Sequence, residues 1–417
     1  MGLAPAAAEA ITPTRGIVVS ALGVAQILAW GSSFYLPAVL AKPIASDTQW
    51  PLSWIVGAVS IGLLISGLVA PRVGRLIDQT GGRPVLATSA ALIAAGQIIL
   101  AVSPNLLVYV AGWLVMGLGM GCGLYDAAFS TLGRLYGSAA RGAITTLTLW
   151  GGFASTVCWP LSAWLVDLVG WRGTCLAYAG LHLTVVLPAY LLVLPRNPDA
   201  AQVDAGRGKP AESSLTRGRL LPAHRRTPVF ALLAVILTAA GIIMSMWSIH
   251  LLTMLQAIGV PLAAAVALGA LVGPSQVGSR IVEMLVGRYH HHPWWTQLAS
   301  STLVATGLAA LALGVPVLAA ALIVYGAGSG LSSIARGTLP LALFGSDGYA
   351  TLMGKLAMPG LLAGAAAPTV GAILLEWIGA PGTLAVLATL AIGNLALVVI
   401  LGLLVRRWAG KDRSEAT

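Results

Sequence analysis

The sequence predicts an all-α membrane protein in which twelve transmembrane helices form two six-helix, pseudo-symmetric bundles. Composition, the spacing of apolar runs and an internal repeat predict this fold. Hydrophobic residue types make up 58% of the 417 residues and charged types only 9%, whereas a soluble domain carries about 25% charged residues. Twelve membrane helices use roughly 240–300 residues. The composition therefore excludes a disordered chain, a fibrous protein and an ordinary soluble enzyme.

Six apolar runs precede a long polar stretch, and six follow it. The first six are 16–41, 52–70, 84–102, 106–133, 143–168 and 173–194. The second six are 229–257, 262–286, 294–313, 316–342, 350–377 and 383–405. Turn-forming residues separate the runs. The sequence thus predicts an N-terminal bundle over 1–195, a linker rich in Arg, Pro, Gly and Ala over 196–228, and a C-terminal bundle over 229–417.

The positive charges predict the orientation in the bilayer. If the N-terminus lies in the cytoplasm, most of the 23 Lys and Arg residues fall on the cytoplasmic side, and the opposite loops hold only Lys42 and Arg172. The basic pI of about 10 then reflects this asymmetry rather than nucleic-acid binding. The first apolar run lacks the basic start of a cleaved signal. We therefore expect a multi-pass protein of the inner (plasma) membrane with both termini in the cytoplasm.

Matching residues indicate that the two halves are copies of one repeat. The glycines of the fourth run, Gly117, Gly119 and Gly121, correspond to Gly326, Gly328 and Gly330 of the tenth. At nearly the same offset, Pro160 falls on Pro368 and Pro51 on Pro261. Two six-helix repeats are the architecture of transporters that move their halves around a central site.

The loop after the second run carries the most specific motif, over residues 74–83. Gly74, Asp78, Gly81 and Arg83 match the pattern G-x-x-x-D-x-x-G-x-R. Glycine permits a tight turn, and the charged pair can bond to helix ends and to each other. The motif resembles the cytoplasmic loop signature of the major facilitator superfamily, and it lies between the second and third runs, as the signature does in that family. The resemblance implies that this loop holds the two halves together in one conformation.

Two departures from the family narrow the resemblance. Trp113 stands where many members have an arginine, ahead of Gly117 and Gly119. The fifth run, over 151–160, lacks the Gly-Pro pair that is common in drug antiporters of the superfamily. The second departure disfavours a proton–drug antiporter.

Arg280 in the eighth run is the first candidate for substrate binding. Its position resembles the arginine that binds the substrate carboxylate in the monocarboxylate-porter and oxalate–formate-antiporter branches. A guanidinium takes a carboxylate through two parallel hydrogen bonds and stays charged. The alternative is an ion pair with Glu283, three residues on along one helix.

Asp126 in the fourth run and Arg336 in the tenth are candidates for gating or proton coupling, and Glu283 joins them. The fourth and tenth helices face each other in the superfamily, so an ion pair between Asp126 and Arg336 could close the inner gate. Asp126 could instead carry the coupling proton. In the alternative reading, each side chain reaches water separately at its helix end.

Four further residues are candidate cavity or substrate contacts: Tyr35, Tyr125, Trp247 and His250. Tyr and Trp also occupy ordinary interfaces, and a lone membrane histidine often only bonds a neighbouring helix. The tract His290-His291-His292 is interpreted as a solvated loop rather than a metal site. The three cysteines, in apolar runs without paired spacing, indicate neither a disulfide framework nor a zinc site. No cofactor is expected.

These observations favour a secondary active transporter, with protons as the expected coupling ion, since no phosphate-binding GxxxxGK[ST] loop occurs. The expected partners are a small organic solute, protons and the lipid bilayer. The best candidate for the solute is a small organic anion such as a monocarboxylate. The chain is expected to be a monomer. The main alternative is an exporter of toxic or hydrophobic compounds. A membrane-embedded enzyme is remote, because no HExxH or GxSxG motif is present.

Overall fold

The structure is a computed structural model that describes residues 13–195, 223–287 and 292–414. Its regular structure over these ranges is helical. The predicted linker up to residue 222 lies outside the described residues, as do His290 and His291. Helix α12 begins at Ala223, inside the predicted linker. A helix can extend beyond its apolar run, so the change in composition does not mark its first residue.

The N-terminal half comprises residues 13–195, and short non-helical segments interrupt several of its predicted spans. The first run becomes two helices, and the fourth and fifth runs are also interrupted. The elements are α1 Arg15–Ser32, α2 Leu36–Thr48, α3 Leu52–Thr80, α4 Gly82–Ala101, α5 Leu106–Gly123, α6 Tyr125–Tyr136, the 3-10 turn Gly137–Ala139, α7 Ala140–Gly152, α8 Ala154–Leu181, the π-helical turn His182–Val186 and α9 Leu187–Val193.

The C-terminal half comprises residues 223–414 and is built in the same way. Its helices are α12 Ala223–Ala257, α13 Leu262–Gly269, α14 Val272–Val286, α15 Trp294–Ala312, α16 Leu318–Phe344 and α17 Tyr349–Ser414. Gly379, at φ 67°, interrupts α17, as Gly170, at φ 69°, interrupts α8. Glycine adopts this left-handed conformation without steric cost.

Eight helical stretches of the described chain are long and apolar enough to cross a membrane. One of them, Leu106–Val193, has 88 residues and as one straight helix would measure about 130 Å. Turns at Gly137 and Gly170, both with positive φ, divide it into shorter segments. The eight stretches therefore contain more than eight crossings. The total of twelve stays a prediction.

The glycine ladders pack alike in the two halves. Ser89 Oγ of α4 donates to the carbonyl of Gly119 at 2.9 Å, and Ser300 Oγ of α15 donates to that of Gly328 at 2.8 Å. A Cβ at either glycine would lie 2.7 Å from the neighbouring helix, so only glycine permits this approach. Small residues commonly mediate helix contacts in membranes. The repeat read from the sequence is thus present in the packing.

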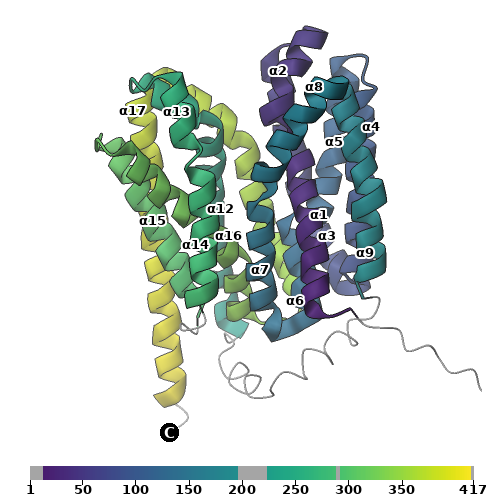
Figure 1. The fold of residues 1–417 in the computed structure, drawn as a ribbon. Coiled ribbons are helices and arrows are strands. Elements are labelled where there is room, and N and C mark those ends of the chain that lie inside the picture. Colours follow the sequence, from purple (N-terminus) through teal and green to yellow (C-terminus); the bar gives the residue numbers. More distant parts are fainter. Residues whose placement is uncertain (1–12, 196–222, 288–291, 415–417) are drawn as a thin grey trace, which may run out of the picture.

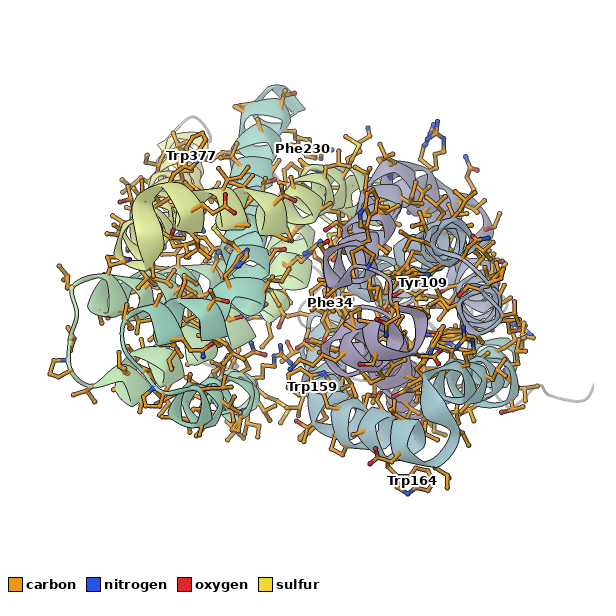
Figure 2. All side chains as sticks on the ribbon, turned by 90° about the horizontal axis from the view of Figure 1, so that it is seen from above. Phe34, Tyr109, Trp159, Trp164, Phe230 and Trp377 are labelled. Carbon is orange, nitrogen blue, oxygen red and sulfur yellow. The ribbon has the colours of Figure 1, made fainter. Side chains whose placement is uncertain are left out.

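The two halves lie side by side. Figure 1 shows the helices of residues 13–195, in purple and blue, beside those of residues 223–414, in green and yellow. We call the end at which α1 begins and α3 ends the terminal end, and the opposite end the far end. Trp164 and Trp377 are 59% and 80% exposed and lie on the outer surface (Figure 2). Such large exposed apolar side chains suit contact with lipid.

Candidate functional site

Arg280 is buried between the two halves. The residue belongs to α14 and is 5% exposed. Its Nη1 donates to the carbonyl oxygen of Thr148 in α7 at 2.8 Å, and its Nε donates to that of Gly330 in α16 at 3.3 Å. Gly152 leaves room for the guanidinium, which a Cβ at that position would meet. The side chain thus crosses from the C-terminal half to a main-chain acceptor of the N-terminal half.

No acidic side chain in the described part of the chain pairs with Arg280. Glu283, the partner considered from the sequence, points elsewhere: its Oε1 accepts a hydrogen bond from Thr296 Oγ1 at 2.7 Å and lies 4.0 Å from Arg141 Nη2. A buried charge without a counterion is unfavourable. The two carbonyls supply dipoles but no negative charge, so the site around Arg280 favours an anion.

Tyr125 lies beside Arg280, and Tyr35 is linked to Tyr125 through Trp30. The Tyr125 hydroxyl donates to the carbonyl of Thr148 at 3.5 Å, the same oxygen that Arg280 contacts. Trp30 links the two tyrosines, with ring centroids 5.1 Å from Tyr125 and 6.1 Å from Tyr35. Thr148 was missed by sequence reasoning because a main-chain acceptor has no residue-type signature.

Trp247 and His250 lie within the C-terminal half, apart from Arg280. Trp247 is 2% exposed and packs on Tyr325, with ring centroids 5.0 Å apart. The His250 Nε2 lies 2.8 Å from the carbonyl oxygen of Pro368 in α17. Among described residues, no polar or aromatic contact joins these two side chains to Arg280. The structure therefore does not bring them into the predicted substrate-binding group.

Asp126 and Arg336 form a bidentate ion pair between α6 and α16. Arg336 Nε donates to Asp126 Oδ1 at 2.9 Å, and its Nη2 donates to Oδ2 at 2.7 Å. The side chains are 17% and 31% exposed, so water screens the pair only in part. Arg336 follows Gly330 by six residues, about 9 Å along the helix. The pair therefore lies on the terminal-end side of Arg280.

The loop motif contacts the start of α17. Asp78 Oδ2 accepts hydrogen bonds from the Thr351 backbone N at 2.7 Å and from its Oγ1 at 2.5 Å. A carboxylate suits the free N–H groups of a helix N-terminus. Arg83 donates instead to the carbonyl of Leu191 in α9. Of the two kinds of contact considered from the sequence, the structure shows bonds to helix ends and no bond between Asp78 and Arg83.

Gly74 and Gly81 serve different purposes in this loop. Gly81, at φ 85°, ends α3 and makes the turn into α4. Gly74 has a helical backbone but faces Ala350, whose carbonyl oxygen occupies the space that a Cβ would need. The close contact of α3 with α17 therefore requires glycine at position 74.

Gly74→Val is expected to lower the initial transport rate by about five-fold or more, because overpacking costs about 1–3 kcal/mol in the closed arrangement. Transport into proteoliposomes, normalised to inserted protein, measures the effect. Gly57→Val is the matched control in the same helix, since a Cβ at Gly57 meets nothing within 4 Å. Equal rates for the two variants would contradict the assignment.

The polar contacts between described residues of the two halves lie from the middle of the molecule to the terminal end. They involve Asp78, Asp126, Arg141 and Arg280. Arg141 Nη2 donates to the carbonyl of Gly287 at 3.4 Å. Among described residues, no such contact joins α2 to the C-terminal half. The structure is therefore held closed at the terminal end.

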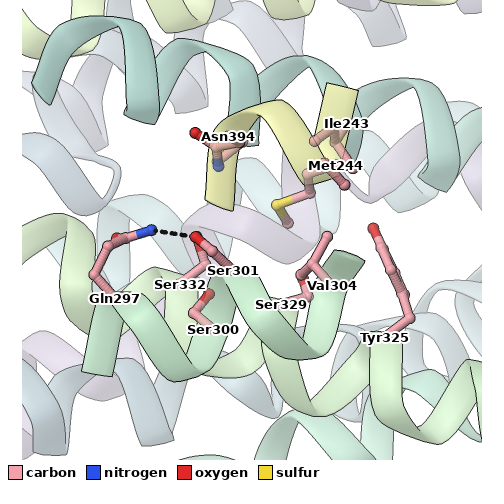
Figure 3. Close-up of a pocket in the computed structure, with 12 residues that line it drawn as sticks. Ile243, Met244, Gln297, Ser300, Ser301, Val304, Tyr325, Ser329, Ser332 and Asn394 are labelled. Atoms are coloured by element: carbon pink, nitrogen blue, oxygen red, sulfur yellow. Dashed lines mark hydrogen bonds between the residues drawn. The ribbon is translucent and has the colours of Figure 1, made fainter. Parts of the chain in front are cut away.

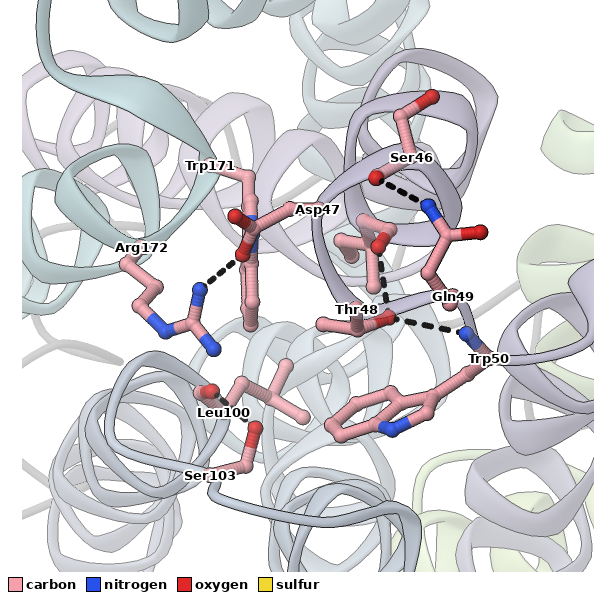
Figure 4. Close-up of polar contacts among 10 residues, drawn as sticks. Ser46, Asp47, Thr48, Gln49, Trp50, Leu100, Ser103, Trp171 and Arg172 are labelled. Atoms are coloured by element: carbon pink, nitrogen blue, oxygen red, sulfur yellow. Dashed lines mark hydrogen bonds and ion pairs between the residues drawn. The ribbon is translucent and has the colours of Figure 1, made fainter.

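At the far end, a polar contact joins two helices of the N-terminal half. Asp47 accepts hydrogen bonds from Trp171 Nε1 at 2.9 Å and from the guanidinium of Arg172, as Figure 4 shows for the arginine. The contact ties α2 to α8, just after the turn at Gly170. Asp47 and Arg172 are 50% and 43% exposed, so the pair is well solvated.

Asp47→Asn is expected to leave the midpoint of thermal unfolding nearly unchanged, because exposed ion pairs contribute little. A thermal unfolding series in detergent, at low and high salt, measures this. A large drop in the midpoint would show that the contact is a structural anchor instead.

A small polar pocket lies inside the C-terminal half (Figure 3). Gln297, Ser301, Ser329 and Asn394 line it, and Gln297 Nε2 donates to Ser301 Oγ at 3.1 Å. The side-chain oxygens of Gln297 and Asn394 have no hydrogen-bond partner among the described residues. The cavity volume is about 30 Å³, which holds about two water molecules. The pocket is thus too small for an organic solute, and the surroundings of Arg280 remain the better candidate.

Comparison with known proteins identifies the family. The model of the Major Facilitator Superfamily matches residues 20–354. The chain belongs to this superfamily. The protein is therefore a multi-pass membrane protein. Membership of this family indicates that it is a transporter and not an enzyme.

Curated relatives match only part of this superfamily member. The chain is 33% identical over 153 residues to a protein of Pseudomonas aeruginosa named Transcription regulatory protein OpdE. The matched region covers 35% of this chain and 36% of that protein. The chain is 28% identical over 156 residues to the Multidrug resistance protein B homolog of Mycobacterium tuberculosis, over 37% and 28% of the two chains. The chain thus spans about a third of the length of these relatives.

Solved structures of the superfamily share the fold over nearly the whole chain. The human organic anion transporter MFSD10 superposes with a TM-score of 0.73 at 17% identity, over 93% of this chain and 100% of that one. The Escherichia coli fucose:proton symporter FucP gives 0.67 at 15% identity, over 93% and 99%. The predicted all-α fold of the superfamily is confirmed. Likeness at such low identity concerns the fold alone.

Proposed function

We propose that this protein is a secondary active transporter of a small organic anion, best a monocarboxylate, driven by protons through alternating access. The observation that carries the proposal is the buried guanidinium of Arg280, which has no acidic partner among described residues. A carboxylate bound there would supply the missing negative charge through two parallel hydrogen bonds. The naming of the structural neighbour MFSD10 as an organic anion transporter agrees with this substrate class.

Alternating access would come from movement of the two halves, with bundles over 1–195 and 229–417 joined by the linker. The excess of Lys and Arg at the terminal end supports an orientation with that end in the cytoplasm. The closed contacts then describe a state shut on the cytoplasmic side. In this state, substrate would reach Arg280 from the far end, which would be the non-cytoplasmic side of the inner membrane.

Proton coupling would act through the ion pair of Asp126 and Arg336. Protonation of Asp126 removes the negative charge and so weakens the bond between α6 and α16. The terminal end could then open. The structural neighbour FucP is described as a fucose:proton symporter, which agrees with a proton as the coupled ion on this fold.

Export of toxic or hydrophobic compounds is the second candidate. The partial match to a Multidrug resistance protein B homolog favours it. Arg280, however, is buried with no carboxylate partner among the described residues, which favours an anion over the cationic compounds that acidic cavities attract.

Internal pH in proteoliposomes tests the proposal. Purified protein is reconstituted with a trapped pH dye, and a panel of small organic acids is added outside. Protein-free liposomes correct for passive entry of the neutral acids. A protein-dependent pH change with one or more acids is the expected result. No change with any acid, in vesicles shown to hold folded protein, would contradict proton-linked anion transport and favour export of another chemical class.

A further inference from the structure

Five aromatic side chains of the N-terminal half pack against one another: Trp30, Phe34, Tyr35, Tyr125 and Trp159. We call them the aromatic cluster. Their ring centroids form a continuous series, with 5.1 Å between Trp30 and Tyr125, 5.4 Å between Phe34 and Tyr35, and 6.1 Å between Tyr35 and Trp159. Distances in this range are those of interacting aromatic pairs. The cluster meets Arg280 at Tyr125, since both donate to the Thr148 carbonyl.

A break in the first span presents part of this cluster. Helix α1 ends at Ser32 and α2 begins at Leu36, so Phe34 and Tyr35 lie at the break. Two buried side chains of the same half hold it: His182 Nε2 lies 2.8 Å from Ser32 Oγ, and Gln97 donates to the Ser32 carbonyl. The break is therefore fixed at Ser32 by hydrogen bonds, and the two aromatic residues that follow it do not lie on a regular helix.

The cluster faces the other half of the molecule and is incompletely covered. Trp159 is 45% exposed, and Phe34 and Tyr35 are half-buried. Seen from above, Phe34 and Trp159 lie on the side of the N-terminal helices that faces the C-terminal half, whereas Trp164 lies on the outer side (Figure 2). Trp159 thus lies, partly exposed, where the N-terminal helices face the C-terminal half.

We propose that the anion taken by this site carries an aromatic ring. The assignment rests on the proposed function. The carboxylate pairs with Arg280, and the ring packs against the aromatic cluster, with Trp159 as the residue that selects it. A short aliphatic acid would satisfy the guanidinium but leave the aromatic surface uncovered. An aromatic acid uses both parts of the site, since aromatic pairs attract beyond simple burial of area.

Binding of three acids to the purified protein tests this: benzoate, cyclohexanecarboxylate and propionate, each by isothermal titration. Benzoate is expected to bind about ten-fold or more tightly than propionate, and more tightly than cyclohexanecarboxylate, which has similar size and charge but no aromatic ring. Trp159→Leu is expected to weaken benzoate binding by about five-fold and to leave propionate binding unchanged.

Trp164→Leu is the matched control, because Trp164 lies in the same helix and is also exposed, but on the outer face. It should leave benzoate binding unchanged. Equal affinity for benzoate and propionate, or equal loss of both in Trp159→Leu, would overturn the aromatic assignment while leaving anion binding intact. Binding of none of the three acids by folded protein would instead contradict the proposed function itself.

Discussion

Replacement of Arg280 by lysine is expected to lower the affinity for a transported carboxylate by about ten- to a hundred-fold. Lysine keeps the positive charge but loses the planar fork, so at least one charge-assisted hydrogen bond of about 1.5–3 kcal/mol is lost. Arg280→Gln should lose more, because the charge is removed as well. The concentration dependence of substrate uptake into proteoliposomes measures both changes.

Arg172→Lys is the matched control for this experiment. Arg172 also bonds across helices, to Asp47, but is 43% exposed and lies at the far end. Its replacement should leave the apparent affinity unchanged. If Arg280→Lys transports like the unchanged protein while inserting normally, carboxylate recognition by this residue is wrong.

Asp126→Asn is expected to open the terminal end. The loss of the charge leaves Arg336 with a neutral partner, and a partly buried pair of this kind contributes about 2 kcal/mol, between the exposed and the fully buried cases. That energy corresponds to a roughly thirty-fold shift between closed and open forms. Transport by this variant should lose its dependence on the proton gradient.

Cysteine accessibility measures this shift. Leu341→Cys, in a background without Cys122, Cys158 and Cys175, places a thiol at a position that is 7% exposed and packed against the N-terminal half. A membrane-impermeant maleimide should label it faster in Asp126→Asn, and the exchanged pair Asp126→Arg with Arg336→Asp should restore slow labelling. Asp47→Asn serves as control. Equal labelling in all variants would exclude a gate at this pair.

Local sequence determined most of the fold. Short stretches of sequence are enough to show the apolar runs, the turn-forming residues and the matched glycines and prolines. In lipid, backbone groups must bond within the chain, so an apolar run of this length has to form a helix. The loop motif also lies within ten residues. Arg280, Asp126 and Arg336 were found because charges are rare in apolar helices and usually face a partner or a cavity.

Only the tertiary structure decided which groups meet. Helices that are apolar on all sides carry little amphipathic signal, so the sequence could not show that Trp247 and His250 point into their own half. The partners of Asp78 and Arg280 are mostly main-chain groups of distant helices, which no residue type marks. Sequence thus determined where charges and breaks occur along each helix, whereas the packing of the two halves determined what each charge contacts.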